Sequence, residues 1–350
     1  MRTRPYPPSW VDRLTATIEK LPIPSWIVYL LAALPWVVAF VVVQAGQGAY
    51  RDDGFYPWHL FVAVQPFFGV AAIHYLDRVG ANALEQFRSA MRGDQADFDY
   101  ARYRLTTLPA RQTMIAGVLG LLFASLQVAV AGDAETTVAL VHVASTPVAL
   151  AAHNFNIIVA WIGYAVVLYH AYHQLRVIDW LYRSRAIIDP FYPQPLYALS
   201  EITSRTAILL LIVIYGWFAV AAGGSLRTLP TERLFYLTSV GVLGLGLVVF
   251  VWPLWGAHRL LVNAKNQELK SNASAYKVAL EKLHSSIFSQ DHDEIEIWQK
   301  AIAAIDLEQR HVDHLATWPW SPGTLRNLLV ALIFPLLVWI IQYGLQQLMG

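Results

Sequence analysis

Residues 26–45 read WIVYLLAALPWVVAFVVVQA, and this stretch decides the fold. It contains no Asp, Glu, Lys or Arg, and its length matches the roughly 20 apolar residues that a helix needs to cross a bilayer. Backbone polar groups inside a bilayer must be paired within the segment, so a helix is the expected conformation. Six further stretches share this character, and they cover residues 58–76, 113–131, 138–170, 206–222, 234–255 and 328–345. The sequence therefore predicts an all-α fold: a polytopic bundle of seven transmembrane helices.

The composition of the 350-residue chain agrees with a membrane protein. Hydrophobic residues make up 56% and charged residues 14%, whereas a soluble domain carries about 25% charged residues. A formal net charge of +1 leaves no basic surface for a nucleic acid, and the lack of cysteine excludes disulfides and thiolate metal sites. The motifs of common hydrolases and nucleotide-binding enzymes are absent from the sequence. We expect a protein of the lipid bilayer that is not an enzyme, with no catalytic residues, cofactor, metal or nucleic-acid partner.

The basic residues predict the direction of the chain through the membrane. Of the 25 Lys and Arg residues, 22 lie in segments on the N-terminal side of the membrane and 3 lie in segments on the opposite side. Lys and Arg accumulate on the cytoplasmic side of membrane proteins. We therefore expect a cytoplasmic N-terminus, a C-terminus outside, and a multi-pass location in the cell membrane (plasma or inner).

This topology divides the chain into three parts. Residues 1–255 form the bundle of the first six spans, residues 256–322 form a cytoplasmic helical hairpin, and residues 323–350 form the seventh helix. Helical spacing of apolar residues continues beyond the sixth stretch, breaks at 286–293, and resumes in a second helix.

The second helix of the hairpin carries an apolar stripe that suggests a role in assembly. Ile295, Trp298, Ile302 and Ile305 follow one another at +3, +7 and +10, which places them on one helical face. Because an apolar stripe that contains a tryptophan is seldom left in water, we expect an assembly surface. A simple connector is the alternative.

Polar side chains within the apolar stretches predict a ligand pocket. Such groups are expensive inside a membrane and usually face the bundle interior or a hydrated cavity. The candidates for the pocket are Gln65, Gln127, His142, His153, Asn154 and Asn156. Two alternatives stay open. These side chains could hold helices together by hydrogen bonds, or His142 or His153 could ligate a haem together with His59 or His74.

Two histidine pairs lie at the end of an apolar stretch or beyond it. His170-x-x-His173 stands where the fourth stretch ends, and Glu308-x-x-His311-x-x-His314 lies on the second hairpin helix. Glu-x-x-His is a spacing used by di-iron bundles, but those sites need further carboxylates from facing helices. We expect a solvated helix face there and no metal.

The topology resembles one family of seven-helix proteins. Rhodopsins are excluded because residues 327–350 contain no lysine for a Schiff base. Insect odorant and gustatory receptors, with their relatives outside insects, share the cytoplasmic N-terminus, the short outside loops and the long cytoplasmic stretch before span seven. The family signature in span seven is Thr-Tyr, five mostly apolar residues and Gln-Phe. Here the corresponding segment is PLLVWIIQY at 335–343, in which Gln342 matches, Tyr343 replaces Phe, and Pro335 and Leu336 depart from Thr-Tyr.

The resemblance implies a tetrameric cation channel. In that family the seventh helix of each subunit lines one central pore, the cytoplasmic helices form the anchoring interface, and ligands enter the outer half of the bundle. By motif position, Gln342 would face the pore, with Tyr343 and Trp339 near its narrowest part. Spacing agrees in part, since Pro335, Trp339, Gln342 and Gln346 fall on one helical face.

Together these observations predict a homo-oligomeric, tetrameric, ligand-gated cation channel of the insect chemoreceptor-like type, opened by a small apolar ligand. A non-conducting membrane sensor or scaffold, whose cytoplasmic hairpin docks a partner, is the alternative from another class. A haem- or quinone-binding redox protein is the third.

Overall fold

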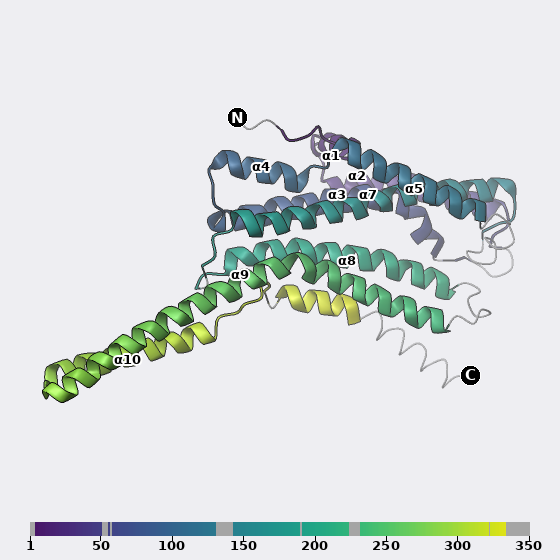
Figure 1. Cartoon of the computed structure of the whole chain (residues 1–350). Helices are drawn as coiled ribbons and strands as arrows, with labels where there is room; N and C mark the ends of the chain where they lie inside the picture. The colour runs from purple at the N-terminus through teal and green to yellow at the C-terminus, as the bar shows by residue number, and fades with distance from the viewer. Residues whose placement is uncertain are drawn as a thin grey trace.

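The computed structural model describes residues 4–50, 55–56, 58–130, 143–189, 191–223, 232–321 and 323–333, and every regular element in these ranges is a helix. The elements in chain order are α1 (Trp10–Glu19), α2 (Ser25–Gly46), α3 (Trp58–Phe87), η1 (Arg88–Ala90), α4 (Gln95–Thr106), α5 (Ala110–Val130), α7 (Pro147–Arg185), α8 (Gln194–Gly223), α9 (Glu232–Ser289) and α10 (His292–Asp313). A short apolar helix, Gly323–Ile333, follows them (Figure 1). The predicted all-α class is confirmed for the described chain.

Five of these helices are long and apolar enough to cross a membrane: Ser25–Gly46, His59–Ala90, Ala110–Ala129, Pro147–Arg185 and Gln194–Gly216. They correspond to the first five predicted stretches. The sixth predicted stretch lies within α9, and the seventh begins in the helix Gly323–Ile333. The rest of the seventh stretch, from residue 334, lies outside the described residues.

The fourth predicted stretch has different bounds in the structure. The sequence pattern places its start at residue 138, but helix α7 begins at Pro147. Proline suits the first position of a helix because it lacks the N–H that would be unpaired there, and the Thr146 hydroxyl accepts a hydrogen bond from the backbone N–H of Ala149 (3.4 Å). Helix α7 then continues to Arg185, well beyond the apolar stretch.

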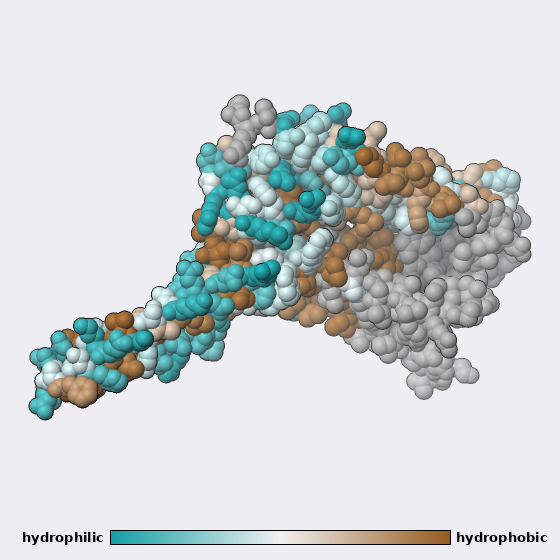
Figure 2. Space-filling model, in the orientation of Figure 1, coloured by the Kyte–Doolittle hydropathy of each residue, from teal (hydrophilic) through white to brown (hydrophobic). Residues whose placement is uncertain are grey.

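The outer surface of the bundle is apolar where lipid would contact it. Trp26 on α2 is 65% exposed, and Leu119, Leu122 and Leu126 on α5 are also exposed. Figure 2 shows hydrophobic residues gathered over the flank of the bundle. Large apolar side chains on the outside of a helical bundle agree with a bilayer as its surroundings.

Helices α3 and α7 run in the same direction and meet along a regular seam. The side chain of Asn156 donates to the backbone carbonyl of Val62, and the Nε2 atom of His170 lies 2.8 Å from Oδ1 of Asp77. Between these contacts the backbones touch, because a Cβ added to Gly69 would lie 3.0 Å from Cα of Gly163. Two spans separated by one antiparallel span must be parallel, and the seam agrees with this order.

One end of the bundle holds the largest buried cluster. There α3, α7 and α8 extend past their apolar stretches, and Phe87, Tyr182 and Leu199 pack with Phe250 and Leu254 of α9. The Tyr182 hydroxyl donates to the carbonyl of Leu196 (2.6 Å). This end is the one to which the Lys and Arg distribution assigns the cytoplasm.

The predicted hairpin is present and projects from this end of the bundle (Figure 1). Helix α9 ends at Ser289, Gln290 has a positive φ of 58°, and α10 begins at His292. The Asp291 side chain caps α10 by accepting from the N–H of Glu294 (3.1 Å). The predicted break at 286–293 is therefore confirmed.

Candidate functional site

The structure brings some of the predicted pocket residues together and not others. Gln65 of α3 and His153 and Asn156 of α7 are buried, whereas Asn154 is half-buried. Gln127 is exposed in the last turn of α5, so the prediction that it lines an interior pocket is wrong for this chain on its own. His142 lies outside the described residues.

The side chains of Asn156 and Gln44 connect neighbouring parts of the chain by hydrogen bonds. Asn156 Oδ1 accepts a hydrogen bond from the indole of Trp36 (2.9 Å), and its amide nitrogen donates to the carbonyl of Val62. Gln44 donates to the carbonyl of Ala149 (3.1 Å) and accepts from the N–H of Ala144 (3.0 Å). The interhelical hydrogen-bond interpretation therefore holds for Asn156.

Gln65 and His153 differ from Asn156. Gln65 is only 2% exposed, and neither of its amide atoms has a hydrogen-bond partner among the described residues. The Nδ1 atom of the buried His153 is also without one in the described chain. A buried polar group without a partner costs about 1–3 kcal/mol, so these atoms favour a bound water or ligand.

Two of the four histidines proposed as haem ligands, His59 and His74, already have hydrogen-bond partners. His74 uses both ring nitrogens, since Nδ1 lies 2.9 Å from the Tyr29 hydroxyl and Nε2 lies 3.1 Å from Oε1 of Glu19. His59 Nδ1 lies 2.7 Å from the Tyr50 hydroxyl. His74 therefore does not fit as an axial ligand without losing one of its contacts.

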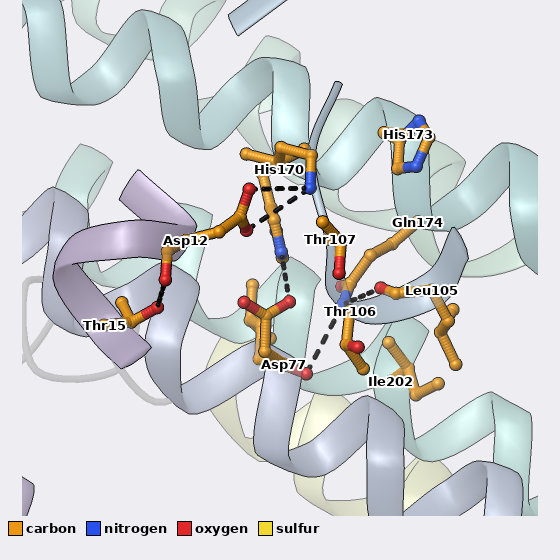
Figure 3. A network of polar contacts seen from close by, with 12 residues as sticks. Asp12, Thr15, Asp77, Leu105, Thr106, Thr107, His170, His173, Gln174 and Ile202 are labelled. Atoms are coloured by element: carbon orange, nitrogen blue, oxygen red, sulfur yellow. Dashed lines mark hydrogen bonds and ion pairs between the residues drawn. The ribbon is translucent and has the colours of Figure 1, made fainter. Parts of the chain in front are cut away.

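The most connected polar site lies at the end of the α3–α7 seam from which the hairpin projects (Figure 3). Asp77 follows the second apolar stretch directly, and its carboxylate contacts His170, which is 1% exposed. Nearby, the amide of Gln174 donates to the carbonyls of Leu105 (3.2 Å) and Leu76 (3.4 Å). The contacts join α3, α4 and α7.

Helix α1 is held against the same site by Asp12. Its carboxylate accepts from the N–H of Leu108 (3.1 Å) and from the N–H and hydroxyl of Ser9 (both 2.7 Å). The Ser9 hydroxyl in turn accepts from the N–H of Asp12, which completes a capping box. Burial raises the pKa of Asp12, and the hydrogen bonds from Ser9 and Leu108 limit that rise.

A second chain of contacts joins α1 to α3. Glu19 Oε1 contacts Nε2 of His74 and lies 3.4 Å from the Nε of Arg78. Partial burial acts to raise the pKa of Glu19, but the hydrogen bonds and charges of His74 and Arg78 outweigh it and hold that pKa below its usual value.

A cavity of about 560 Å³ opens beside this network. Its lining includes the carboxylates of Asp12, Glu19 and Asp77 and the guanidinium groups of Arg4, Arg13, Arg78 and Arg102. Asp77 thus contacts both a buried histidine and a polar cavity.

Sequence reasoning identified His170 but missed Asp77 as its partner. Asp77 is the first charged residue after the second apolar stretch. A charged residue at this position indicates where a span ends, but it does not indicate which residue of a neighbouring helix it contacts. The partner follows only from the register of α3 against α7.

The remaining predicted site residues fall into three groups. Ile295, Trp298, Ile302 and Ile305 are half-buried on α10, which packs on α9. Glu308, His311 and His314 are exposed, and within the described residues no group of three His, Cys, Asp or Glu side chains is placed to hold a metal. The predicted pore residues Trp339, Gln342, Tyr343 and Gln346 lie outside the described residues.

Comparisons with protein-family models, with curated proteins and with solved structures find no match to this chain.

Proposed function

We propose that the chain forms a homo-oligomeric, tetrameric cation channel with seven spans and a cytoplasmic N-terminus, opened by a small apolar ligand. The observation that carries this proposal is the projecting hairpin. Its two helices bury one face against each other and leave other apolar side chains in solvent: Phe288 is 88% exposed and Leu307 is 71% exposed. A second copy of the hairpin would cover these side chains, and apolar surface of this kind is typical of interfaces.

The segment that connects the hairpin to the helix Gly323–Ile333 also supports the channel proposal. Trp318 stacks on the His258 ring (4.0 Å between centroids) and on Trp320 (4.4 Å), and Trp320 stacks on Phe250 of α9 (5.4 Å). This aromatic stack fixes the start of the helix Gly323–Ile333 against the bundle. A hairpin that assembles around an axis would thereby place four copies of the last apolar stretch near that axis.

The start of the last helix is anchored within its own subunit. Leu328 and Leu332 are buried in the main cluster, and the Tyr215 hydroxyl donates to the carbonyl of Leu332 (3.1 Å). In the proposed channel, Gln342 faces the pore by its position in the span-seven motif, and Trp339 and Gln346 share its face by their spacing. Amide side chains in a ring can replace part of the hydration shell of a passing cation.

The ligand would occupy the region of Gln65 and of His153, where both amide atoms of Gln65 and the Nδ1 atom of His153 have no hydrogen-bond partner among the described residues. Both come from the central helices α3 and α7, so a ligand there would act on the seam that positions the rest of the bundle. A mostly apolar pocket with a few polar groups is the usual form of a small-molecule site.

Planar-bilayer recording of the purified protein, together with its mass in mild detergent, tests the channel. We expect a tetramer and single-channel steps, and we expect Gln342→Ala to change conductance or ion selectivity without changing the mass. Gln127→Ala, which removes an exposed amide from α5, is the matched control and should leave conductance unchanged. A monomer that conducts no ion with any ligand would contradict the proposal.

A scaffold is the second candidate, because the same exposed hairpin could dock a different protein. A stoichiometric partner bound through residues 260–320 of a monomer that does not conduct would favour it. The redox alternative is tested by the visible absorption spectrum, since a colourless sample excludes haem.

A further inference from the structure

We infer that a second cavity at the cytoplasmic end of the bundle binds the headgroup of an anionic phospholipid. This cavity has a volume of about 590 Å³ and lies between the N-terminal segment, α4, the start of α5 and the end of α7. It is separate from the cavity beside Asp77, and the proposed channel function does not depend on it.

The charge of the lining distinguishes the two cavities. The cavity beside Asp77 combines its arginines with three carboxylates. The second cavity is lined by Arg104, Arg176 and Arg183 and by a single carboxylate, Asp179, whose Oδ1 already pairs with Arg183 (2.9 Å). Within the described residues neither Arg104 nor Arg176 has a carboxylate within 4.0 Å. The second cavity therefore carries uncompensated positive charge.

Aromatic rings hold both unpaired guanidinium groups in place. The Arg104 Cζ lies 4.5 Å from the ring centroid of Trp180, and the Arg176 Cζ lies 5.7 Å from that of Tyr172. A guanidinium stacked on a ring keeps its N–H edges free for a second partner, and those edges match the oxygens of a phosphate. Arg176 donates one N–H to the Tyr172 hydroxyl (3.3 Å), so four of its five N–H donors remain for a ligand.

The backbone that carries Arg104 is also fixed. The Tyr6 hydroxyl donates to the carbonyl of Thr107 (3.0 Å), and Nε2 of His173 lies 2.8 Å from the carbonyl oxygen of Arg104. Burial raises the pKa of Tyr6 well above its usual range, so the hydroxyl remains a donor at neutral pH. Arg104 is thus half-buried on a rigid support, as a binding residue should be.

The position of the cavity favours a lipid over a soluble anion. Gln112 lines it one residue before the third apolar stretch, and Tyr169 and Tyr172 line it where the fourth ends. Tyr and Trp at such a boundary mark the headgroup level of a bilayer. From there, the exposed side chains of Met114, Ile115 and Leu168 continue along the α5–α7 pair and offer an apolar track for acyl chains. Basic pockets between membrane helices on the cytoplasmic side are suited to anionic headgroups.

Native mass spectrometry of the full-length protein with phosphatidylglycerol or phosphatidylcholine tests this site. We expect tighter binding of phosphatidylglycerol, and we expect Arg104→Gln with Arg176→Gln to weaken it by roughly fivefold for each guanidinium, on the order of 25-fold for the pair. The matched control is Arg92→Gln with Arg111→Gln. It removes the same charge from the same end of the bundle, but neither residue lines the cavity, so it should leave the preference for phosphatidylglycerol intact.

Three outcomes would overturn the inference. They are equal binding of the two lipids, an equal loss in the control variant, or displacement of phosphatidylglycerol by millimolar inorganic phosphate, which would assign the site to a soluble anion. The single variant Arg176→Gln changes an exposed side chain and should fold even if the double variant does not. Arg104→Lys with Arg176→Lys keeps the charge without the planar N–H edge, so a planar guanidinium site predicts an affinity between those of wild type and the glutamine variant.

Discussion

Helix α7 and the projecting half of α9 are both long helices, but their surroundings differ completely. Helix α7 contacts α2, α3, α4, α5, α8 and α9, and much of its length is buried. The projecting half of α9 packs on α10, and apolar side chains on this hairpin remain exposed (Figure 2). Contacts within one subunit therefore cover most of α7, whereas they leave apolar side chains of the hairpin exposed. Substitutions in α7 contacts should therefore affect stability, and substitutions in the hairpin should affect assembly.

The largest effect is expected where α5 crosses α7. A Cβ at Gly120 would lie 2.6 Å from the carbonyl oxygen of Trp161 and 2.9 Å from the Cβ of Ala165, so Gly120→Leu should separate the helices. We expect a loss of about 3 kcal/mol, measured by thermal unfolding in detergent. Among the described residues, a Cβ at Gly244 meets no atom within 4 Å, so Gly244→Leu is the control with little effect. Equal melting temperatures for the two variants would contradict the close packing.

A smaller loss is expected at the end of the α3–α7 seam from which the hairpin projects. Asp77→Ala leaves the buried His170 without its carboxylate, and we expect a cost of about 2 kcal/mol in the same unfolding measurement. The control lies on the hairpin, where Asp306→Ala removes an exposed i,i+4 pair with Arg310 and should cost about 0.5 kcal/mol or less. If the two variants lost equal stability, the Asp77–His170 pair would not be a structural contact of the seam.

The smallest effect on stability is expected in the hairpin, where assembly should change instead. Phe288→Glu with Leu307→Glu places charge on two exposed apolar positions, so we expect an unchanged melting temperature of the subunit and loss of the oligomer in light scattering. Gln299→Glu with Gln309→Glu adds the same charge at exposed polar positions of α10 and should leave the oligomer intact. An oligomer that survives the first variant would show that these apolar side chains do not form its interface.

Features that depend on composition or on local signals were predictable from the sequence. The first five apolar stretches are helices of spanning length, and the turn of the hairpin lies where Asp291 supplies the N-cap of α10. The bounds were predicted less well where a helix continues in polar sequence, as α7 does to Arg185. Beyond the apolar stretch the hydropathy pattern no longer indicates a helix, but α7 continues because it packs on α4 and α9.

Features that depend on the register between helices were not predictable. Asp77 and His170 are 93 residues apart in sequence, and only the parallel seam brings them together. In the same way, polarity marked both Gln65 and Gln127, but one is buried and the other faces outward. Arg104 and Arg176 come from different helices, so their shared cavity was not visible from either segment.

The length of α9 gives the molecule a mechanical property. The helix runs without interruption from Glu232 to Ser289, and Pro253 stands within it at the level where the apolar stretch ends. A proline removes one hydrogen bond of the helix and makes that turn easier to bend. Leu254, Ala257 and Leu261 pack in the main cluster just beyond it, and the 28 residues after Leu261 form a rod about 42 Å long, so a tilt of about 7° at its base would move the tip by about 5 Å. A small change in the angle of this rod would therefore displace the tip of the hairpin by a distance comparable to the length of a side chain.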